Sequence, residues 1–272
     1  MAHKNKTNIS PYKTRKERDG LSGKALAQGN HGRHKRPEVI YSLEEANDRL
    51  ADIFRNHEFG HITHEQRKKL AHFYRLLMET QGKENFTRLL KIKDIAIKHF
   101  IDCMIVAKLT ELTFPLMDVG TGPGFPGIPL KILYPEQKII LAEGVQRRVE
   151  FLKNVREEMD LKNLAIIGRN INPYFAYPVQ GVITRAVEDV GNTLANVLTS
   201  LQTGGKVFLM KGPNVDPEIK AAKELSEFYA LEKDIAYTLP GTEDHRRLLV
   251  YKKIKMAPLP DFEEEPWPED ET

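Results

Sequence analysis

A glycine-rich segment has the residue types and the spacing of a loop that binds a nucleotide-like cofactor. Residues 118–127 read Asp-Val-Gly-Thr-Gly-Pro-Gly-Phe-Pro-Gly and are followed by a helix-like pattern that begins at Ile128. Glycine has no Cβ and tolerates positive φ, so backbone in such a loop can come close to a ligand. The following helix points free N–H groups at the same place. The loop residues that we predict to bind the cofactor are Asp118, Gly120, Thr121, Gly122, Gly124 and Phe125.

The spacing within this loop favours one of two cofactor classes. Residues 122–127 match the dinucleotide pattern G-x-G-x-x-G, which is weak when it stands alone. Residues 118–122 also read Asp-x-Gly-x-Gly, which resembles the first motif of the S-adenosylmethionine-dependent methyltransferases. Glu143, at the end of the next predicted strand, is placed to bind ribose hydroxyls in either class. Pro123 and Pro126 lack the N–H groups that a pyrophosphate would use, which favours S-adenosylmethionine over NAD.

The pattern downstream of residue 110 alternates between strands and helices. Alternation of this kind predicts a parallel sheet with helices on both faces. The last two predicted strands, 231–239 and 246–254, are joined only by a turn-like segment, so we expect an antiparallel pair at the end of the sheet. Methyltransferases of this class carry such a pair and dinucleotide dehydrogenases usually lack it. The other predicted strands are 116–119, 138–143, 164–167, 181–184 and 206–211, and the predicted helices are 126–134, 146–159, 187–201 and 217–227.

Residues 38–110 are predicted to form an N-terminal helical cap on a methyltransferase-like domain of residues 111–256. Ser42 and Thr63 each precede a helical pattern and have Glu45 and Gln66 at the capping-box position. The second of these helices is expected to reach about residue 79, and a third to cover residues 92–109.

Charge is distributed unevenly along the 272 residues, although the net charge is only +3. Residues 1–37 contain ten Lys and Arg and two acidic residues, whereas residues 257–272 contain seven acidic residues and no basic one. We predict both ends to be disordered. The basic end is either an arm that binds nucleic acid through phosphate attraction or a solubilising tail, and the sequence favours neither.

Cysteine content and hydropathy indicate a cytoplasmic protein without a membrane segment. The single cysteine, Cys103, excludes an intramolecular disulfide, and the N-terminus has no leader-like pattern. Apolar stretches are shorter than the roughly 20 residues that cross a bilayer. We expect a monomer.

Residues from about 70 to 254 resemble the bacterial small-subunit ribosomal RNA guanine-N7 methyltransferases, the glucose-inhibited-division B family. Three prolines in and after the glycine loop distinguish this family from methyltransferases in general. The resemblance rests on residues 118–130, on Glu84-Asn85-Phe86-Thr87, on residues 98–103 and 147–152, on Thr184-Arg185-Ala186 and on Met210-Lys211-Gly212.

This resemblance implies a class I Rossmann-like methyltransferase with a seven-stranded, mostly parallel sheet. It implies transfer of a methyl group from S-adenosylmethionine to guanine N7 in 16S ribosomal RNA, at position 527 of standard rRNA numbering. The partner would be this RNA or the small ribosomal subunit. Arg185 is the predicted catalytic residue and also a cofactor contact, because it ends a strand where open α/β sheets place ligands. The predicted substrate-binding residues are His99, Arg169, Lys211 and Arg246.

The chain departs from the family pattern after the third predicted strand. Where the family has a small residue and Glu, the chain has Asn170 and Ile171, and Ile171 cannot accept a hydrogen bond. Both residues are predicted to lie at the adenine of the cofactor. The adenine would then be held by backbone groups or by the Asn170 or Asn172 side chain. Cys103 replaces a serine of the family.

Several alternatives remain open. The chain could methylate another RNA, a protein or a small molecule, or could be a non-catalytic RNA-binding assembly factor, which Ile171 makes conceivable. His99 and Asp102, three residues apart, could be a structural pair as readily as a substrate contact. Histidines near residues 57–72 lack cysteines or carboxylates at ligand spacing, so we expect no metal site.

Overall fold

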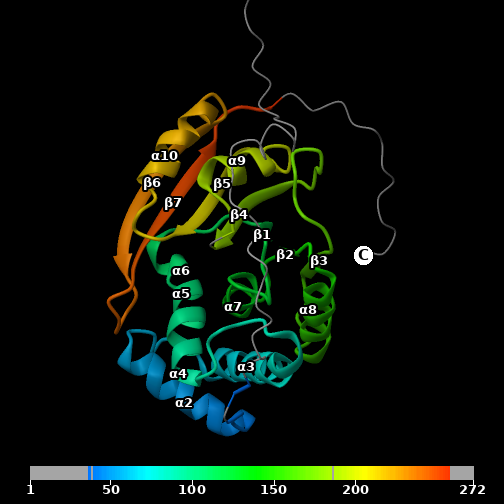
Figure 1. Ribbon diagram of the computed structural model, residues 1–272, viewed down its shortest axis with the longest axis vertical. Coiled ribbons are helices and arrows are strands. Elements are labelled where there is room, and N and C mark those ends of the chain that lie inside the picture. The colour runs from blue at the N-terminus through cyan, green and yellow to red at the C-terminus, as the bar shows by residue number, and fades with distance from the viewer. Residues whose placement is uncertain (1–35, 38, 186, 258–272) are drawn as a thin grey trace, which may run out of the picture. The chain divides into compact units, whose positions relative to one another are not determined.

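The computed structural model describes residues 36–37, 39–185 and 187–257. These contain a seven-stranded sheet with the order β3-β2-β1-β4-β5-β7-β6 (Figure 1). The predicted ends 1–37 and 257–272 fall almost wholly outside the described residues, as does Ala186. The strands are β1 (Leu116–Val119), β2 (Ile139–Ala142), β3 (Leu164–Ile167), β4 (Val179–Arg185), β5 (Leu201–Lys211), β6 (Tyr229–Thr238) and β7 (His245–Lys253). The helices are α2 (Leu43–Asn56), α3 (His64–Glu84), α4 (Ile92–Ile95), the π-helical η1 (Ala96–Ile101), α5 (Asp102–Met104), α6 (Val106–Leu109), α7 (Gly127–Leu133), α8 (Gln146–Glu158), α9 (Val190–Asn196), α10 (Asp216–Ala221) and the 3₁₀-helical η2 (Ala222–Leu225).

The sheet has the predicted mixture of parallel and antiparallel pairs. Strands β1 to β5 pair in parallel, and β7 runs antiparallel to both β5 and β6. The helices fall into two groups, with α3, α7 and α8 in contact in one and α9, α10 and η2 in the other (Figure 1). The predicted α/β fold with a terminal antiparallel pair is therefore confirmed.

The two predicted helix caps differ in detail. Ser42 Oγ accepts a hydrogen bond from the Glu45 N–H at 3.2 Å, but the Glu45 side chain pairs with Arg49 instead of returning to the cap. Thr63 and Gln66 form the complete reciprocal capping box. Helix α3 continues five residues beyond the predicted end, because its pattern persists until Asn85 adopts a left-handed conformation with φ 51°.

Three predicted helices are shorter or less regular in the structure than the sequence pattern indicated. The helix expected over residues 92–109 is divided into α4, η1, α5 and α6. The helix expected over residues 187–201 covers only Val190–Asn196, and Leu201 already begins β5. The chain leaves the helix because the Thr199 and Ser200 hydroxyls hydrogen-bond to the carbonyls of Pro173 and Phe175. Similarly, α10 ends at Ala221 and η2 replaces its expected continuation.

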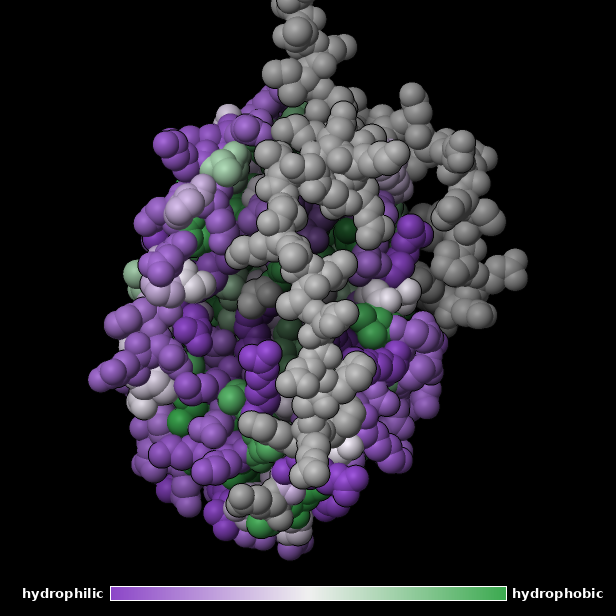
Figure 2. Space-filling view, viewed as in Figure 1, coloured by the Kyte–Doolittle hydropathy of each residue, from purple (hydrophilic) through white to green (hydrophobic). Residues whose placement is uncertain are grey.

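One hydrophobic core joins the N-terminal helices to the sheet. It includes Leu50, Phe73 and Phe100 from the helices and Leu116 and Leu141 from the strands, none of them more than 1% exposed. The face shown in Figure 2 is mainly hydrophilic, with scattered hydrophobic residues. Within the described ranges, none of the helices combines the length and the apolar character needed to cross a membrane. The shared core fixes the helices against the strand ends that form the site.

Candidate active site

The glycine loop follows β1 and is organised around the buried carboxylate of Asp118. Thr121 Oγ1 and the Gly127 N–H both donate to Asp118 Oδ2 at 2.6 Å. Asp118 is 0% exposed, and burial raises the pKa of its carboxyl to about 7, against the opposing effect of these two hydrogen bonds. The carboxylate therefore holds the loop together from inside through hydrogen bonds to two loop residues.

Three glycines of the loop have positive φ, but they need glycine for different reasons. A Cβ on Gly120 would lie 2.8 Å from the Val187 side chain, and one on Gly124 would lie 2.4 Å from Ile128. A Cβ on Gly122 would meet no described atom within 4 Å. Gly122 therefore borders open space, whereas Gly120 and Gly124 are required by packing within the protein.

Glu143 follows β2 and is held beside the loop by backbone donors. Its Oε2 accepts from the Gly122 N–H at 2.9 Å, and its Oε1 accepts from the Val145 N–H at 2.8 Å. Arg148 lies 3.4 Å from Oε2. This geometry ties the ends of β1 and β2 together and orients a carboxylate at the predicted ribose position.

A cavity of about 190 Å³ lies at the carboxyl ends of β1, β2 and β4. Of the predicted residues it brings together Gly120, Arg169, Asn170 and Ile171. The Asn172 side chain, one of the groups predicted to hold the adenine, accepts a hydrogen bond from the Tyr174 N–H in a local turn. The lining residues that sequence reasoning missed are Val119, Ala142, Thr184, Val187, Glu188, Thr193 and Asn196. The strand ends among them could have been found from the rule that ligands bind at carboxyl ends of parallel strands.

Phe125 and His99 lie together between the glycine loop and the N-terminal helices, and they do not line this cavity. The His99 ring stacks on Phe125 with centroids 4.4 Å apart, and Phe73 approaches the same ring at 5.2 Å. Phe125 is only 4% exposed. Phe125 therefore packs the loop against the helices, and its contact with the cofactor stays a prediction.

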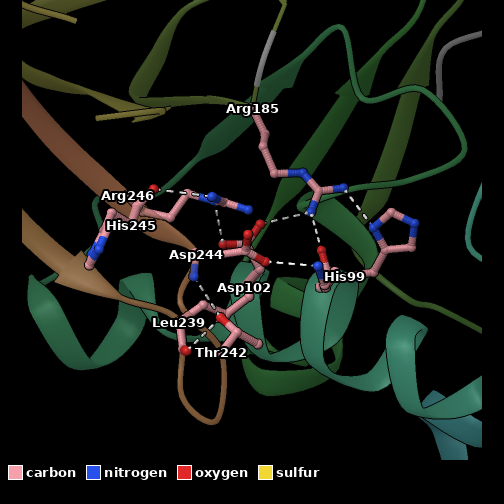
Figure 3. Close-up of polar contacts among 9 residues, drawn as sticks. His99, Asp102, Arg185, Leu239, Thr242, Asp244, His245 and Arg246 are labelled. Atoms are coloured by element: carbon pink, nitrogen blue, oxygen red, sulfur yellow. Dashed lines mark hydrogen bonds and ion pairs between the residues drawn. The ribbon is translucent and has the colours of Figure 1, made fainter. Parts of the chain in front are cut away.

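Arg185, at the end of β4, reaches into the helical segment that contains η1 (Figure 3). Its Nη1 donates to Asp102 Oδ2 and to the Lys98 carbonyl, both at 3.2 Å, and Nη2 lies 3.2 Å from His99 Nδ1. The guanidinium also lies 5.3 Å from the centre of the Phe125 ring. π-Helical turns often occur at functional sites, and here η1 presents the Lys98 carbonyl and the His99 ring to Arg185, while Asp102 follows at the start of α5.

His99 has protein partners at both ring nitrogens. Arginine can only donate, so His99 Nδ1 accepts from Arg185, and Nε2 is left to donate to Thr87 Oγ1 at 2.9 Å. Burial and the charge of Arg185 lower the pKa of His99 to about 3. Among the described residues, the His99 and Asp102 side chains are linked through Arg185 and not by a side-chain hydrogen bond of their own, and the substrate contact of His99 stays a prediction.

Asp102 connects Arg185 to the start of β7. Arg246 Nε lies 3.7 Å from Asp102 Oδ1 (Figure 3). A neighbouring charged pair, Lys98 Nζ with Asp244 Oδ2, is separated by 2.9 Å. Burial raises the pKa of Asp102, whereas Arg185 and Arg246 act to lower it. Arg246 therefore lies at the edge of the same cluster as His99 and Arg185.

The other two predicted substrate residues lie elsewhere around the cavity. Lys211 donates to the Glu188 carbonyl and to Glu218 Oε2, which supports the segment that leads into α9. Arg169 lies with its guanidinium 4.8 Å from the centre of the Phe175 ring. In the described residues we find no group of three or more His, Cys, Asp or Glu side chains suited to a metal ion.

Comparison with known proteins identifies the family. Residues 66–249 match the model of the GidB family, described as rRNA small subunit methyltransferase G. The chain belongs to this family.

Relatives of the methyltransferase G family match most of the chain. Ribosomal RNA small subunit methyltransferase G 2 of Bdellovibrio bacteriovorus is 67% identical, over 86% of this chain and 92% of that protein. The methyltransferase G of Carboxydothermus hydrogenoformans is 36% identical, over 74% of this chain and 89% of that protein. Among solved structures, TrmN from Thermus thermophilus has a TM-score of 0.46 at 15% identity, over 63% of this chain and 51% of that chain. The sequence matches alone carry the assignment.

Membership of the methyltransferase G family confirms the predicted resemblance, the enzyme class and S-adenosylmethionine as the cofactor. The site fits this cofactor in two respects. Gly122 borders open space, and the buried Thr184 hydroxyl at the cavity has no hydrogen-bond partner among the described residues. The individual site residues stay predictions.

Proposed function

We propose that this enzyme transfers the methyl group of S-adenosylmethionine to N7 of a guanine in 16S ribosomal RNA, at position 527 of standard rRNA numbering. The observation that carries the proposal is the family match, because residues 66–249 include the glycine loop, the cavity and Arg185. The single buried cysteine suits the proposed cytoplasmic location. A monomer suffices for the proposed site, because one chain supplies the whole cavity lining.

The proposed residues would bind different parts of the cofactor at neighbouring strand ends. Glu143, already oriented by two backbone N–H groups, would bind the ribose hydroxyls. Asn170 and the backbone near Ile171 would hold the adenine, while Gly122 leaves room for the ligand. When bound, S-adenosylmethionine supplies an electrophilic methyl group on a sulfonium.

The side chains of the site suit a reaction that needs alignment more than proton transfer. Guanine N7 has an in-plane lone pair and no proton to lose, so a general base is not required. His99 is neutral and has both nitrogens engaged, and Asp118 is turned into the loop. Arg185 keeps its guanidinium fixed by the Lys98 carbonyl, His99 and Asp102, and we propose that it positions the reacting groups.

The decisive experiment maps N7-methylguanine in 16S RNA from a strain that lacks this chain. We expect one modification to disappear and to return when the wild-type gene is supplied. Calorimetry of the purified protein should show S-adenosylmethionine binding. Cofactor binding with unchanged 16S modification would favour a different methyl acceptor, and absence of binding would favour a non-catalytic assembly factor.

A further inference from the structure

A buried hydroxyl at the cavity lacks a hydrogen-bond partner. Thr184 is 2% exposed and lies next to the last residue of β4. Its Oγ1 is buried and has no hydrogen-bond partner among the described residues. Thr184 is also one of the residues that line the 190 Å³ cavity. Buried hydroxyl groups in proteins are normally hydrogen-bonded, so this one is expected to acquire a partner when the cavity is filled.

The direction of the Thr184 side chain follows from strand alternation. Arg185, its neighbour, points to the helical segment with Asp102 and His99. Successive side chains of a strand point to opposite faces, so Thr184 points to the face of the sheet opposite that of Arg185. Thr193 and Asn196 of α9 line the same cavity, which places the Thr184 side chain toward it.

The sheet register places Thr184 in a row with two apolar side chains. Val119 is directly opposite Ala142, and Asp118 is opposite Ile183, so Thr184 follows in line with Val119. All three row members line the cavity, and only Thr184 carries a polar side-chain atom. A ligand that lies across these strand ends can therefore form a hydrogen bond to a side chain of this row only at Thr184, on β4.

The order of the strands indicates which end of the ligand reaches Thr184. In the sheet order β3-β2-β1-β4, the adenine site proposed at Asn170 follows β3, and the ribose site proposed at Glu143 follows β2. The remaining part of S-adenosylmethionine, its amino-acid end, would then extend past β1 toward β4. Its carboxylate accepts hydrogen bonds and its ammonium donates them, and a hydroxyl can serve either group.

We infer, on the basis of the proposed function, that the Thr184 hydroxyl binds the amino-acid end of S-adenosylmethionine. Thr184 is thus a cofactor-binding residue whose contact is separate from those of the glycine loop and of Glu143. The hydroxyl group supplies the hydrogen bond, and the threonine methyl group contributes only packing. Serine in place of threonine should therefore retain the interaction.

The test compares two ligands on the full-length protein by calorimetry. S-adenosylhomocysteine contains the amino-acid end, and 5′-methylthioadenosine lacks it. Thr184→Val, which keeps the side-chain shape, should weaken S-adenosylhomocysteine binding by about tenfold or more, since hydrogen bonds to charged groups are the stronger ones. Its affinity for methylthioadenosine should stay within about twofold of the wild type. Thr184→Ser should bind both ligands with nearly wild-type affinity.

A matched control separates this effect from loss of a threonine in general. Thr80→Val removes a hydroxyl that donates to the Leu76 carbonyl within α3 and should leave both affinities unchanged. Equal weakening of both ligands by Thr184→Val would place the contact on the adenosine and overturn the inference. Unchanged binding of both, with a raised KM for RNA only, would assign the hydroxyl to the substrate and overturn it also. Failure of the wild type to bind any of these ligands would instead contradict the proposed function.

Discussion

The glycine loop meets the Arg185 cluster, which consists of His99, Asp102, Arg185 and Arg246, at Phe125, and the two regions are stabilised in different ways. In the loop, one carboxylate, Asp118, accepts from a hydroxyl and a backbone N–H within nine residues of itself. In the cluster, Asp102 and Arg185 meet across 83 residues, and Arg246 comes from a third element. The loop therefore depends on local backbone shape, whereas the cluster depends on charged groups brought together by folding.

The largest expected effect is on the free energy of unfolding, and it should differ between removal of the Asp102 and of the Asp118 carboxylate. Asp102→Ala would leave Arg185 partly buried without its counterion, so we expect a loss of about 3 kcal/mol or more in the free energy of unfolding. Asp118→Ala would leave one hydroxyl and one N–H unsatisfied, with a smaller loss of about 2 kcal/mol. Denaturant unfolding measures both. An equal or reversed order would mean that the loop and the cluster do not differ as described.

Arg185→Lys tests whether the cluster serves catalysis. Lysine keeps the charge but cannot contact Asp102, His99 and the Lys98 carbonyl with one planar group. We expect turnover to fall by about tenfold or more, on the scale of one charge-assisted hydrogen bond, with a much smaller change in S-adenosylmethionine affinity. Arg49→Lys, at an exposed pair with Glu45, is the control. Full activity in Arg185→Lys would remove Arg185 from the proposed site.

Gly122→Ala tests the loop with little disturbance of packing. The added Cβ would enter open space and the backbone strain at φ 60° should cost about 1 kcal/mol, so we expect lost cofactor affinity in a folded protein. Gly204→Ala is a matched control in β5, because it also has positive φ and open space. Gly120→Ala should be less stable than either, since its Cβ meets Val187. Unchanged cofactor affinity in Gly122→Ala would contradict the assigned pocket.

The raised pKa of Asp118 predicts that the stability contributed by this loop residue depends on pH. An unfolded aspartate has a pKa near 4, whereas burial raises that of Asp118 to about 7, so the folded state binds the proton more tightly. This contribution to stability is present below about pH 4 and is lost as the pH rises to about 7. Asp118→Asn should therefore remove a downward slope between these values. The same slope in wild type and variant would show that Asp118 does not titrate in this range.

The smallest expected effect on the described site comes from deleting residues 1–37. Their ten positive charges should add phosphate contacts without reading sequence, so deletion should weaken RNA binding and flatten its salt dependence. S-adenosylmethionine affinity and the modified nucleotide should not change. Plots of log affinity against log salt for both forms measure this. Identical slopes would favour the solubilising-tail interpretation.

Most of the fold could be predicted, and the errors have physical causes. Alternating patterns located all seven strands, and Thr63 marked the start of α3 correctly. Sequence patterns could not reveal that Thr199 and Ser200 hydrogen-bond to residues near 174, which ends α9 early. They also could not reveal the π-helical turn, because its apolar residues fit a regular helix equally well.

The sequence by itself determined the glycine loop, its carboxylate and the acid after β2, because these groups act within a few residues or at predictable strand ends. The tertiary structure decided at which loop glycine an added Cβ would meet a neighbour, since Val187 approaches Gly120 from another segment. It also decided that His99 pairs with Arg185 across 86 residues, and that Thr184 is left with an unpaired hydroxyl at the cavity. Local contacts follow from chain geometry, whereas these follow from how the helices and the sheet pack.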